Sequence, residues 1–135
     1  MFDLGKLDSV TARNLSPQVL AFVGDGVYSL YVRQMLVMTS GLKGRDLHNQ
    51  VTSYVKAAGQ SNFIERLMPV LDETEMAVFK RARNHKTLSQ AKNQNIIDYR
   101  RATGLEAVLG YLYLIGKIDR LNEILKLSIG ENDEN

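Results

Sequence analysis

The chain lacks several residue types on which whole classes of site depend. It has no cysteine and no tryptophan, and only two histidines and two prolines among its 135 residues. The absence of cysteine excludes disulfides, thiolate metal sites and cysteine nucleophiles, and it favours a reducing, cytoplasmic setting. With only His48 and His85 available, a zinc site built from protein ligands alone is not expected.

Long apolar runs are absent as well. The longest stretch without a charged residue covers residues 14–24 and contains Asn, Ser, Pro and Gln, so no segment is predicted to cross a membrane. Hydrophobic residues make up 44% of the chain and charged residues 24%, which is the balance of a globular protein with a real core. The sequence therefore predicts one domain over residues 1–135, with no membrane partner.

The spacing of apolar residues predicts an all-α fold. Ser16 and Pro17 form a helix start, in which a hydroxyl cap precedes a ring that suits the first helical position. Asp72 and Glu75 have the spacing of a capping box at the start of another helix. The helical core is expected to cover about 16–129 and to end in a short acidic tail, with helices at about 17–38, 46–58, 61–68, 72–84, 98–115 and 118–129.

Each of the two most apolar helices carries an isolated acidic residue. Asp25 lies in a helix that is apolar nearly all round, so we expect little water around it. Glu106 is the only charged residue between positions 102 and 116. A buried carboxylate is costly unless it is paired, protonated or bound to a metal, and hard oxygen ligands favour Mg²⁺ or Mn²⁺. The core-facing residues of the first helix are predicted to be Val19, Leu20, Val23, Val27, Leu30 and Tyr31.

The same residues admit simpler explanations. Glu106 follows Thr103 by three positions, which is the spacing of a capping box at a helix start. Asp25 could instead pair with an arginine of another helix or lie on an exposed strip. Because glycine weakens a helix, Gly24 and Gly26 indicate that a neighbouring helix, or a metal with a phosphate backbone, approaches closely there. Spacing alone leaves these alternatives open.

Positive charge is concentrated in one segment, although the net charge is only +2. Residues 80–101 contain seven basic residues and a single acidic one, together with several Asn and Gln side chains. Such a mixture suits contacts with the phosphates and sugars of a nucleic acid, while a charge run can also be an ordinary solvated helix end. The candidate nucleic-acid-binding residues are Lys80, Arg81, Arg83, Asn84, Lys86, Lys92, Arg100 and Arg101.

The segments around the two isolated carboxylates carry family motifs. The segment VLAFVGDGVYSLYVRQML resembles the signature helix of ribonuclease III endonuclease domains, which reads roughly ERLEFLGDAVLxLxxxxxL. The segment RATGLEAVLGYLYL resembles the second catalytic helix of that family, ADxFEALIGAIYLD. Asp25 matches the aspartate of the GDA core, and Glu106 matches the glutamate before the ALIG-like run. The resemblance thus selects the same two residues that stand alone in apolar helices.

The chain departs from the family pattern at three positions. It has Gln18 and Ala21 where the signature has glutamates, and Thr103 where it has an aspartate. The resemblance still covers about 16–127, and the sequence ends without the double-stranded-RNA-binding domain of full-length relatives. Both features favour the reduced variant, Mini-ribonuclease III, and a single ribonuclease III-like endonuclease domain.

This resemblance implies a metal-dependent endoribonuclease that cleaves double-stranded RNA. Asp25 and Glu106 would be the catalytic and metal-binding residues, with Mg²⁺ or Mn²⁺ as cofactor. A cytoplasmic homodimer is also implied, for which Phe22, Tyr28 and Tyr31 are candidate contacts, as is a role in maturation of the 23S ribosomal RNA precursor. Without an accessory domain, the basic segment is expected to help hold the duplex.

Two other functions stay open at this stage. Ala21 and Thr103 prompt the first, a catalytically weakened domain that binds structured RNA without cutting it. The second is a helical protein-interaction module, in which the basic segment contacts an acidic protein partner. The roles of His48 and His85 do not follow from the sequence.

Overall fold

The structure, a computed structural model, describes residues 2–57, 61–85 and 96–129. Within these ranges it contains helices and no strand, so the all-α fold predicted from the sequence is confirmed. No helix in the described part of the chain is long and apolar enough to span a membrane. The elements are α1 (Ser9–Arg13), α2 (Pro17–Thr39), α3 (Arg45–Ala57), α4 (Ser61–Leu67), the 3-10 turn η1 (Met68–Val70), α5 (Glu73–Arg83), α6 (Ile96–Leu114) and α7 (Ile118–Ser128).

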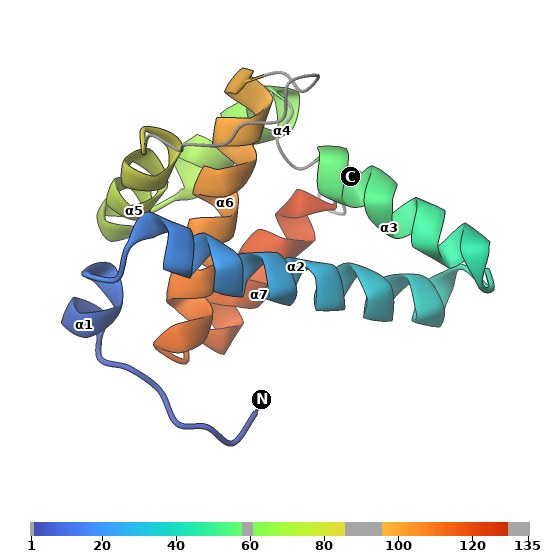
Figure 1. Ribbon diagram of the computed structural model, residues 1–135, viewed down its shortest axis with the longest axis horizontal. Coiled ribbons are helices and arrows are strands. Elements are labelled where there is room, and N and C mark those ends of the chain that lie inside the picture. The colour runs from blue at the N-terminus through green and yellow to red at the C-terminus, as the bar shows by residue number, and fades with distance from the viewer. Residues whose placement is uncertain (1, 58–60, 86–95, 130–135) are drawn as a thin grey trace.

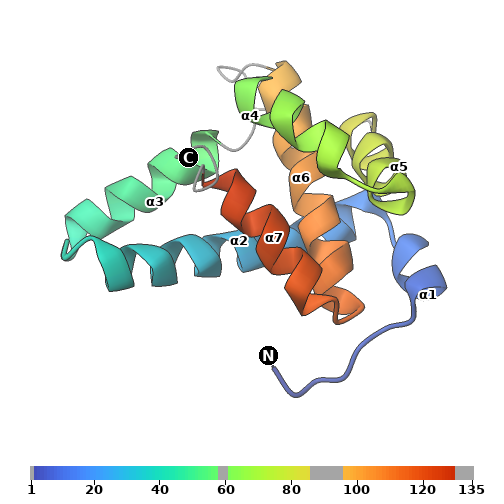
Figure 2. The ribbon, with the colours of Figure 1, turned by 180° about the vertical axis from the view of Figure 1, so that it is seen from behind.

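Helix α6 lies at the centre of the molecule. Helix α2 crosses it on one face, α7 lies on the opposite face, and α5 runs beside it, as the front and back views show (Figures 1 and 2). Every residue of α6 from 104 to 112 is buried except Glu106. A helix that is surrounded in this way must be apolar nearly all round, which explains the long uncharged stretch in its sequence.

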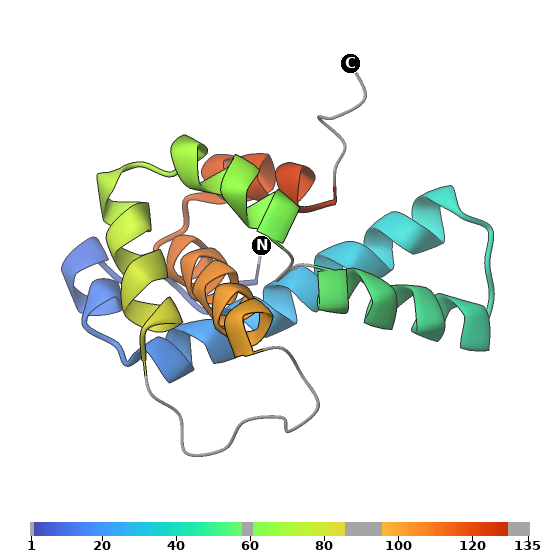
Figure 3. The same cartoon turned by 90° about the horizontal axis from the view of Figure 1, so that it is seen from above.

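Only the first half of α2 crosses the body of the molecule. The second half continues outward and packs against α3, so that the two helices form an arm (Figures 1 and 3). Tyr28 lies where the arm leaves the body and is fully buried, with its hydroxyl donating to the backbone oxygen of Tyr54 at 3.3 Å. Burial raises the pKa of Tyr28 to about 12, so this side chain stays a neutral hydrogen-bonding core residue.

Two glycines allow α2 and α6 to cross in backbone contact. A Cβ atom on Gly24 would overlap the carbonyl oxygen of Glu106, and one on Gly110 would overlap the carbonyl oxygen of Leu20. No larger residue fits at either position without moving the helices apart. Gly26, by contrast, has open space where its Cβ would be. The neighbouring helix therefore explains the first glycine of the pair and not the second.

The helix starts predicted from the sequence are confirmed. Ser16 caps α2 by accepting from the backbone nitrogen of Val19, and Pro17 occupies the first turn. Asp72 and Glu75 form the expected reciprocal capping box at the start of α5. The short helix α1 and the turn η1 were not predicted, because each has too few residues to show a period.

The predicted core-facing stripe of α2 is right at Leu20 and wrong at Val19 and Leu30. Val19 and Leu30 were assigned to the core stripe, yet each is 45% exposed. The side that packs inward instead carries Leu20, Ala21, Gly24, Tyr28, Val32 and Leu36. Because α2 is apolar on almost every side, periodicity could not choose between its faces, and the close crossing at Gly24 decides which one is buried.

Candidate active site

The crossing of α2 and α6 brings the two isolated carboxylates together. Gly24 touches the backbone of Glu106, and Asp25 is the next residue along α2. The Asp25 carboxylate lies close enough to the Glu106 side chain to interact with its charge. The pairing expected from the sequence is therefore present, and two residues 81 positions apart meet because of one helix crossing.

The two carboxyl groups differ in their surroundings. Asp25 is exposed, so the expectation that it has little water around it is wrong. Glu106 is half-buried, and its pKa rises to about 8 because burial disfavours its charge and the nearby Asp25 carboxylate repels it. At neutral pH the pair therefore holds a proton, and it carries an excess of negative charge that a cation would neutralise.

Thr103 does not cap a helix, so that alternative for Glu106 is wrong. It lies well inside α6, which begins at Ile96, and its hydroxyl donates to the backbone oxygen of Tyr99 at 3.0 Å. Thr103 and Glu106 are one turn apart on the same side of the helix. Glu106 thus has no capping role, and its raised pKa marks it as a candidate functional residue.

The residues present fit a divalent cation with only two protein carboxylates. Ala21 is buried and Thr103 half-buried, and neither offers a charged oxygen beside the Asp25–Glu106 pair. In the described residues no group of three or more His, Cys, Asp or Glu side chains could hold a metal. Mg²⁺ commonly binds through one or two carboxylates and keeps several waters, so the donor set suits this hard ion. Asp25 and Glu106 are the side chains that would hold it.

A third carboxylate, Glu75, is buried but structural. It is 2% exposed, and both of its oxygens accept hydrogen bonds from Arg120, at 2.7 Å and 2.8 Å. One of these oxygens also accepts from the backbone nitrogen of Asp72. Glu75 raises the pKa of Arg120, as expected for an ion pair. Glu75 has hydrogen-bond partners for both oxygens and holds α5 against α7. Glu106, by contrast, lies beside another acid, Asp25, and not beside a base.

The candidate RNA-binding residues fall at the end of α5 and the start of α6. Lys80, Arg81 and Asn84 are exposed, while Arg83, Arg100 and Arg101 are half-buried. Arg81 also donates to the backbone oxygens of Arg13 and Leu15, so it secures the α1–α2 connection. Lys86 and Lys92 lie outside the described residues.

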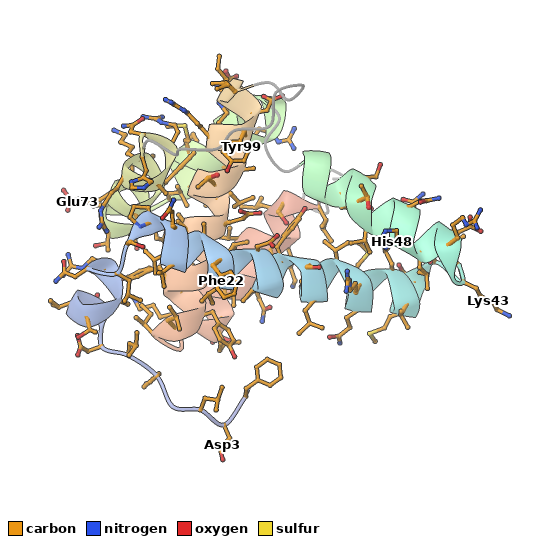
Figure 4. The ribbon with its side chains drawn as sticks, in the orientation of Figure 1. Asp3, Phe22, Lys43, His48, Glu73 and Tyr99 are labelled. Atoms are coloured by element: carbon orange, nitrogen blue, oxygen red, sulfur yellow. The ribbon has the colours of Figure 1, made fainter. Side chains whose placement is uncertain are left out.

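Helix α2 has exposed apolar side chains, of which the sequence had already named Phe22 as a candidate dimer contact. Phe22 is 81% exposed and stands on the outer side of α2 (Figure 4). A groove of about 660 Å³, which Phe22 does not line, runs along α2, and residues of α2 and α7 line it together with Phe2 and Tyr113. The sequence did contain a signal, because α2 has more apolar residues than one buried stripe requires. The apolar groove residues of α2 are Val23, Val27, Leu30, Tyr31, Met35 and Met38.

The candidate dimer contacts do not share one environment. Phe22 is exposed and Tyr31 lines the groove, so both are accessible. Tyr28 is only 1% exposed and packs within the core of the chain. The prediction that Tyr28 contacts a second subunit is therefore wrong, since its ring already packs in the core, beside α3.

Comparisons with known proteins agree with this geometry. The family model described as the ribonuclease III domain matches residues 18–117, which include both carboxylates. A mini-ribonuclease 3 from Clostridium tetani is 43% identical over 127 residues, covering 90% of this chain and 82% of the relative. A mini-ribonuclease 3 from Brevibacillus brevis is 50% identical over 111 residues, covering 82% of this chain and 83% of the relative.

The fold is also similar to a solved structure. A crystal structure of a protein from Fusobacterium nucleatum superposes with a TM-score of 0.75 at 28% identity, covering 89% of this chain and 96% of that one. The sequence resemblance, the fold and the meeting of Asp25 with Glu106 thus agree. This chain belongs to the ribonuclease III domain family and, within it, to the mini-ribonuclease 3 group.

Proposed function

We propose that this protein is an endoribonuclease that cleaves double-stranded RNA in a metal-dependent reaction, with Asp25 and Glu106 as its catalytic pair. Membership of the ribonuclease III family supports an endoribonuclease. The observation that carries the site assignment is the meeting of two acidic side chains at the α2–α6 crossing, where the pKa of Glu106 is raised to about 8. Adjacent acids of this kind are disfavoured in a folded chain unless a cation or a proton accompanies them.

The two carboxylates have different tasks in this proposal. Mg²⁺ or Mn²⁺, when bound, supplies an activated water and stabilises the charge on the leaving oxygen. Glu106 is fixed by the central helix α6, so it provides a rigid position on the protein side. Asp25 is exposed on α2, so it faces the solvent from which the RNA backbone must approach. Glu106 must release its proton before it can bind a cation, so metal binding is coupled to pH.

The proposal extends to a homodimer that uses the exposed face of α2. Helix α2 exposes Phe22, at 81%, and it also contributes Leu30 and Tyr31 to an apolar groove. Exposed apolar surface of this kind marks interaction sites in folded proteins. A second copy covering this face would bring two Asp25–Glu106 pairs into one assembly, one for each strand of a duplex. The similarity to mini-ribonucleases 3 extends the proposal to cytoplasmic maturation of the 23S ribosomal RNA precursor.

A cleavage assay on a long RNA duplex with Mg²⁺ tests the function. Wild type is compared with Asp25→Asn and Glu106→Gln, and single-stranded RNA and EDTA serve as controls. Asp119→Asn removes an exposed acid from α7 and is the matched control variant. We expect wild type and Asp119→Asn to cut the duplex, while each site variant loses about 10³-fold in rate and still binds RNA.

Other results would select one of the alternative functions. Duplex binding by wild type without cleavage in any divalent cation would leave a structured-RNA-binding protein. Binding no stronger than that of an unrelated protein of equal charge would leave a protein-interaction module. Retained cleavage in Asp25→Asn and Glu106→Gln would show that the catalytic pair is assigned to the wrong residues.

A further inference from the structure

A half-buried arginine at the start of α6 has a donor that the chain does not satisfy. The Nε atom of Arg100 is buried without a hydrogen-bond partner, and it is the only such side-chain nitrogen or oxygen found among the described residues. Buried donors are nearly always hydrogen-bonded, because water removed from a charged group must be replaced by another acceptor. The structure thus supplies no acceptor for this guanidinium donor, which leaves it available for another group once the side chain turns towards it.

The other arginines of the basic segment already have partners. Arg81 donates through Nη1 to the backbone oxygens of Arg13 and Leu15, at 2.8 Å and 3.0 Å. Arg83 donates through Nε to Asn84 Oδ1 at 3.1 Å, and its guanidinium carbon lies 5.7 Å from the centre of the Phe79 ring. Arg101 also has an interaction partner. The unsatisfied Nε distinguishes Arg100 from these neighbours.

Basic residues outnumber acidic ones in the segments around Arg100, where Asp98 is the single acid of residues 80–85 and 96–101. Gly104 follows it by one turn on the same side of α6, and a Cβ there would lie 3.0 Å from the Phe79 ring of α5. This side of α6 therefore faces α5. The end of α5 and the start of α6, which Tyr99 marks in Figure 4, lie on the same side of the molecule (Figure 3). Residues 80–85 at that end of α5 contain three basic residues and no acid.

We propose that Arg100 binds a backbone phosphate of the duplex RNA, donating to phosphate oxygens through Nε and the neighbouring Nη. The proposal rests on the proposed function and singles out one anchor among the eight candidate RNA-binding residues. A phosphate supplies the acceptor that Nε lacks, and its negative charge suits this end of the α5–α6 pair, where residues 80–85 and 96–101 contain five basic residues and one acid, Asp98. The planar guanidinium fork matches two phosphate oxygens, which an ammonium group cannot do with the same geometry.

Binding of a labelled RNA duplex in EDTA tests this assignment without cleavage. The variants are Arg100→Met, which keeps the apolar stem, and Arg100→Lys, which keeps the charge but loses Nε. Lys126→Met removes one exposed positive charge from α7, on the opposite face of α6 from α2 (Figure 2), and is the matched control. Thermal unfolding of each variant without RNA is measured alongside.

We expect Arg100→Met to weaken duplex binding by about tenfold or more and to lower the slope of log affinity against log salt by about one. Arg100→Lys should recover only part of that affinity, and Lys126→Met should stay within about twofold of wild type. The unfolding midpoint of Arg100→Met should not fall, because the lost side chain holds no acceptor in the chain.

Two outcomes would overturn the assignment. Arg100→Met could bind the duplex as wild type does, which would mean that no phosphate uses this side chain. It could instead unfold at a clearly lower temperature, which would mean that the guanidinium supports the fold. Failure of wild type itself to bind duplex RNA would contradict the proposed function, and wild-type binding in the same assay separates the two failures.

Discussion

Helices α2 and α6 have nearly the same sequence pattern and opposite surroundings. Each is long and apolar on almost every side, and each carries an isolated acid near its middle. From 104 to 112, α6 is buried except at Glu106. In α2, by contrast, Phe22 is 81% exposed and Met38 is 73% exposed. A helix that is apolar on almost every side can therefore be either buried in the core or partly exposed, and the periodicity of the sequence does not distinguish the two.

The two helices differ in their packing. Other helices of the chain surround α6, whereas part of the surface of α2 is exposed. The apolar surface of α6 is buried against α2, α5 and α7, whereas the part of the chain that the structure describes leaves Phe22 and Met38 of α2 largely exposed. Large exposed apolar surfaces are retained where another molecule covers them. The active-site pair lies at the boundary, with Glu106 on the covered helix and Asp25 on the open one. We therefore expect a charge placed in α6 to unfold the chain, and a charge placed on the exposed side of α2 to dissociate the proposed dimer.

The largest expected effect comes from placing a charge on each helix in turn. Leu109 of α6 is 0% exposed, so Leu109→Glu buries a carboxylate and should destabilise the chain by on the order of 5 kcal/mol or more, enough to unfold it. Phe22→Glu should leave the unfolding midpoint of the isolated chain nearly unchanged, and it should convert a dimer into a monomer. Circular dichroism and light scattering measure these two effects.

This pair of variants also tests the dimer proposal by itself. Phe22→Leu keeps the face apolar and is the control that should remain dimeric. A wild type that is monomeric at micromolar concentration would contradict a second copy as the occupant of this face. A Phe22→Glu chain that unfolds would contradict the view that this side of α2 has no role in the single-chain core.

The next effect concerns the crossing itself. Gly24→Ala would force a Cβ into the backbone of Glu106, which cannot move aside, so we expect a loss of about 3 kcal/mol or more. Gly26→Ala adds a Cβ to open space inside a helix and should stabilise the chain by about 0.5–1 kcal/mol. Urea unfolding compares the two. Equal effects at both glycines would show that helix propensity, and not the α6 backbone, determines the cost.

The sequence was sufficient to predict the six longer helices and to single out Asp25 and Glu106 as unusual acids. Caps such as Ser16 and Asp72 act locally, so their structures follow from a few neighbouring residues. Asp25 and Glu106 could be singled out because a carboxylate alone in an apolar helix is unusual, and the family resemblance selected the same residues. Both are properties of short segments, which a single sequence does record.

Properties that depend on the crossing of helices could not be predicted. The buried side of α2 is decided by contact between Gly24 and α6, so the predicted stripe through Val19 was wrong. Tyr28 was assigned to a dimer interface for the same reason, because any face of an apolar helix can be the outer one. The ion pair of Glu75 with Arg120 joins residues 45 positions apart, and only Glu75's capping role was visible locally.

The half-buried acid on α6 should make stability depend on pH. The pKa of Glu106 rises from 4.5 to about 8 on folding, so the folded chain keeps a proton that the unfolded chain loses in that range. The contribution of Glu106 to the free energy of unfolding is therefore fully present below pH 4.5 and is lost as the pH rises towards 8. For a half-buried group we expect the total loss to be about 2 kcal/mol. Urea unfolding at several pH values without divalent cations measures this loss.

Two variants separate the causes of that pH dependence. Glu106→Gln cannot lose the proton, so the difference between it and wild type should grow with pH across the same range. Asp25→Asn removes the charge that repels Glu106 and should therefore lower the pKa of Glu106. The pH interval over which stability is lost should then be narrower than in wild type. Parallel pH profiles for wild type and Glu106→Gln would contradict the raised pKa.

The smallest expected effect compares one buried tyrosine from each helix. Tyr111 of α6 hydrogen-bonds Ser9 Oγ at 2.8 Å, and Tyr28 of α2 donates to the Tyr54 oxygen at 3.3 Å. Because the first bond is shorter, Tyr111→Phe should cost about 1 kcal/mol and Tyr28→Phe about half of that. Urea unfolding of both variants under identical conditions resolves the difference. A larger loss of unfolding free energy at Tyr28 would mean that the arm of α2 and α3 is held firmly to the body of the molecule. The difference between α2 and α6 would then be confined to the exposed surface around Phe22.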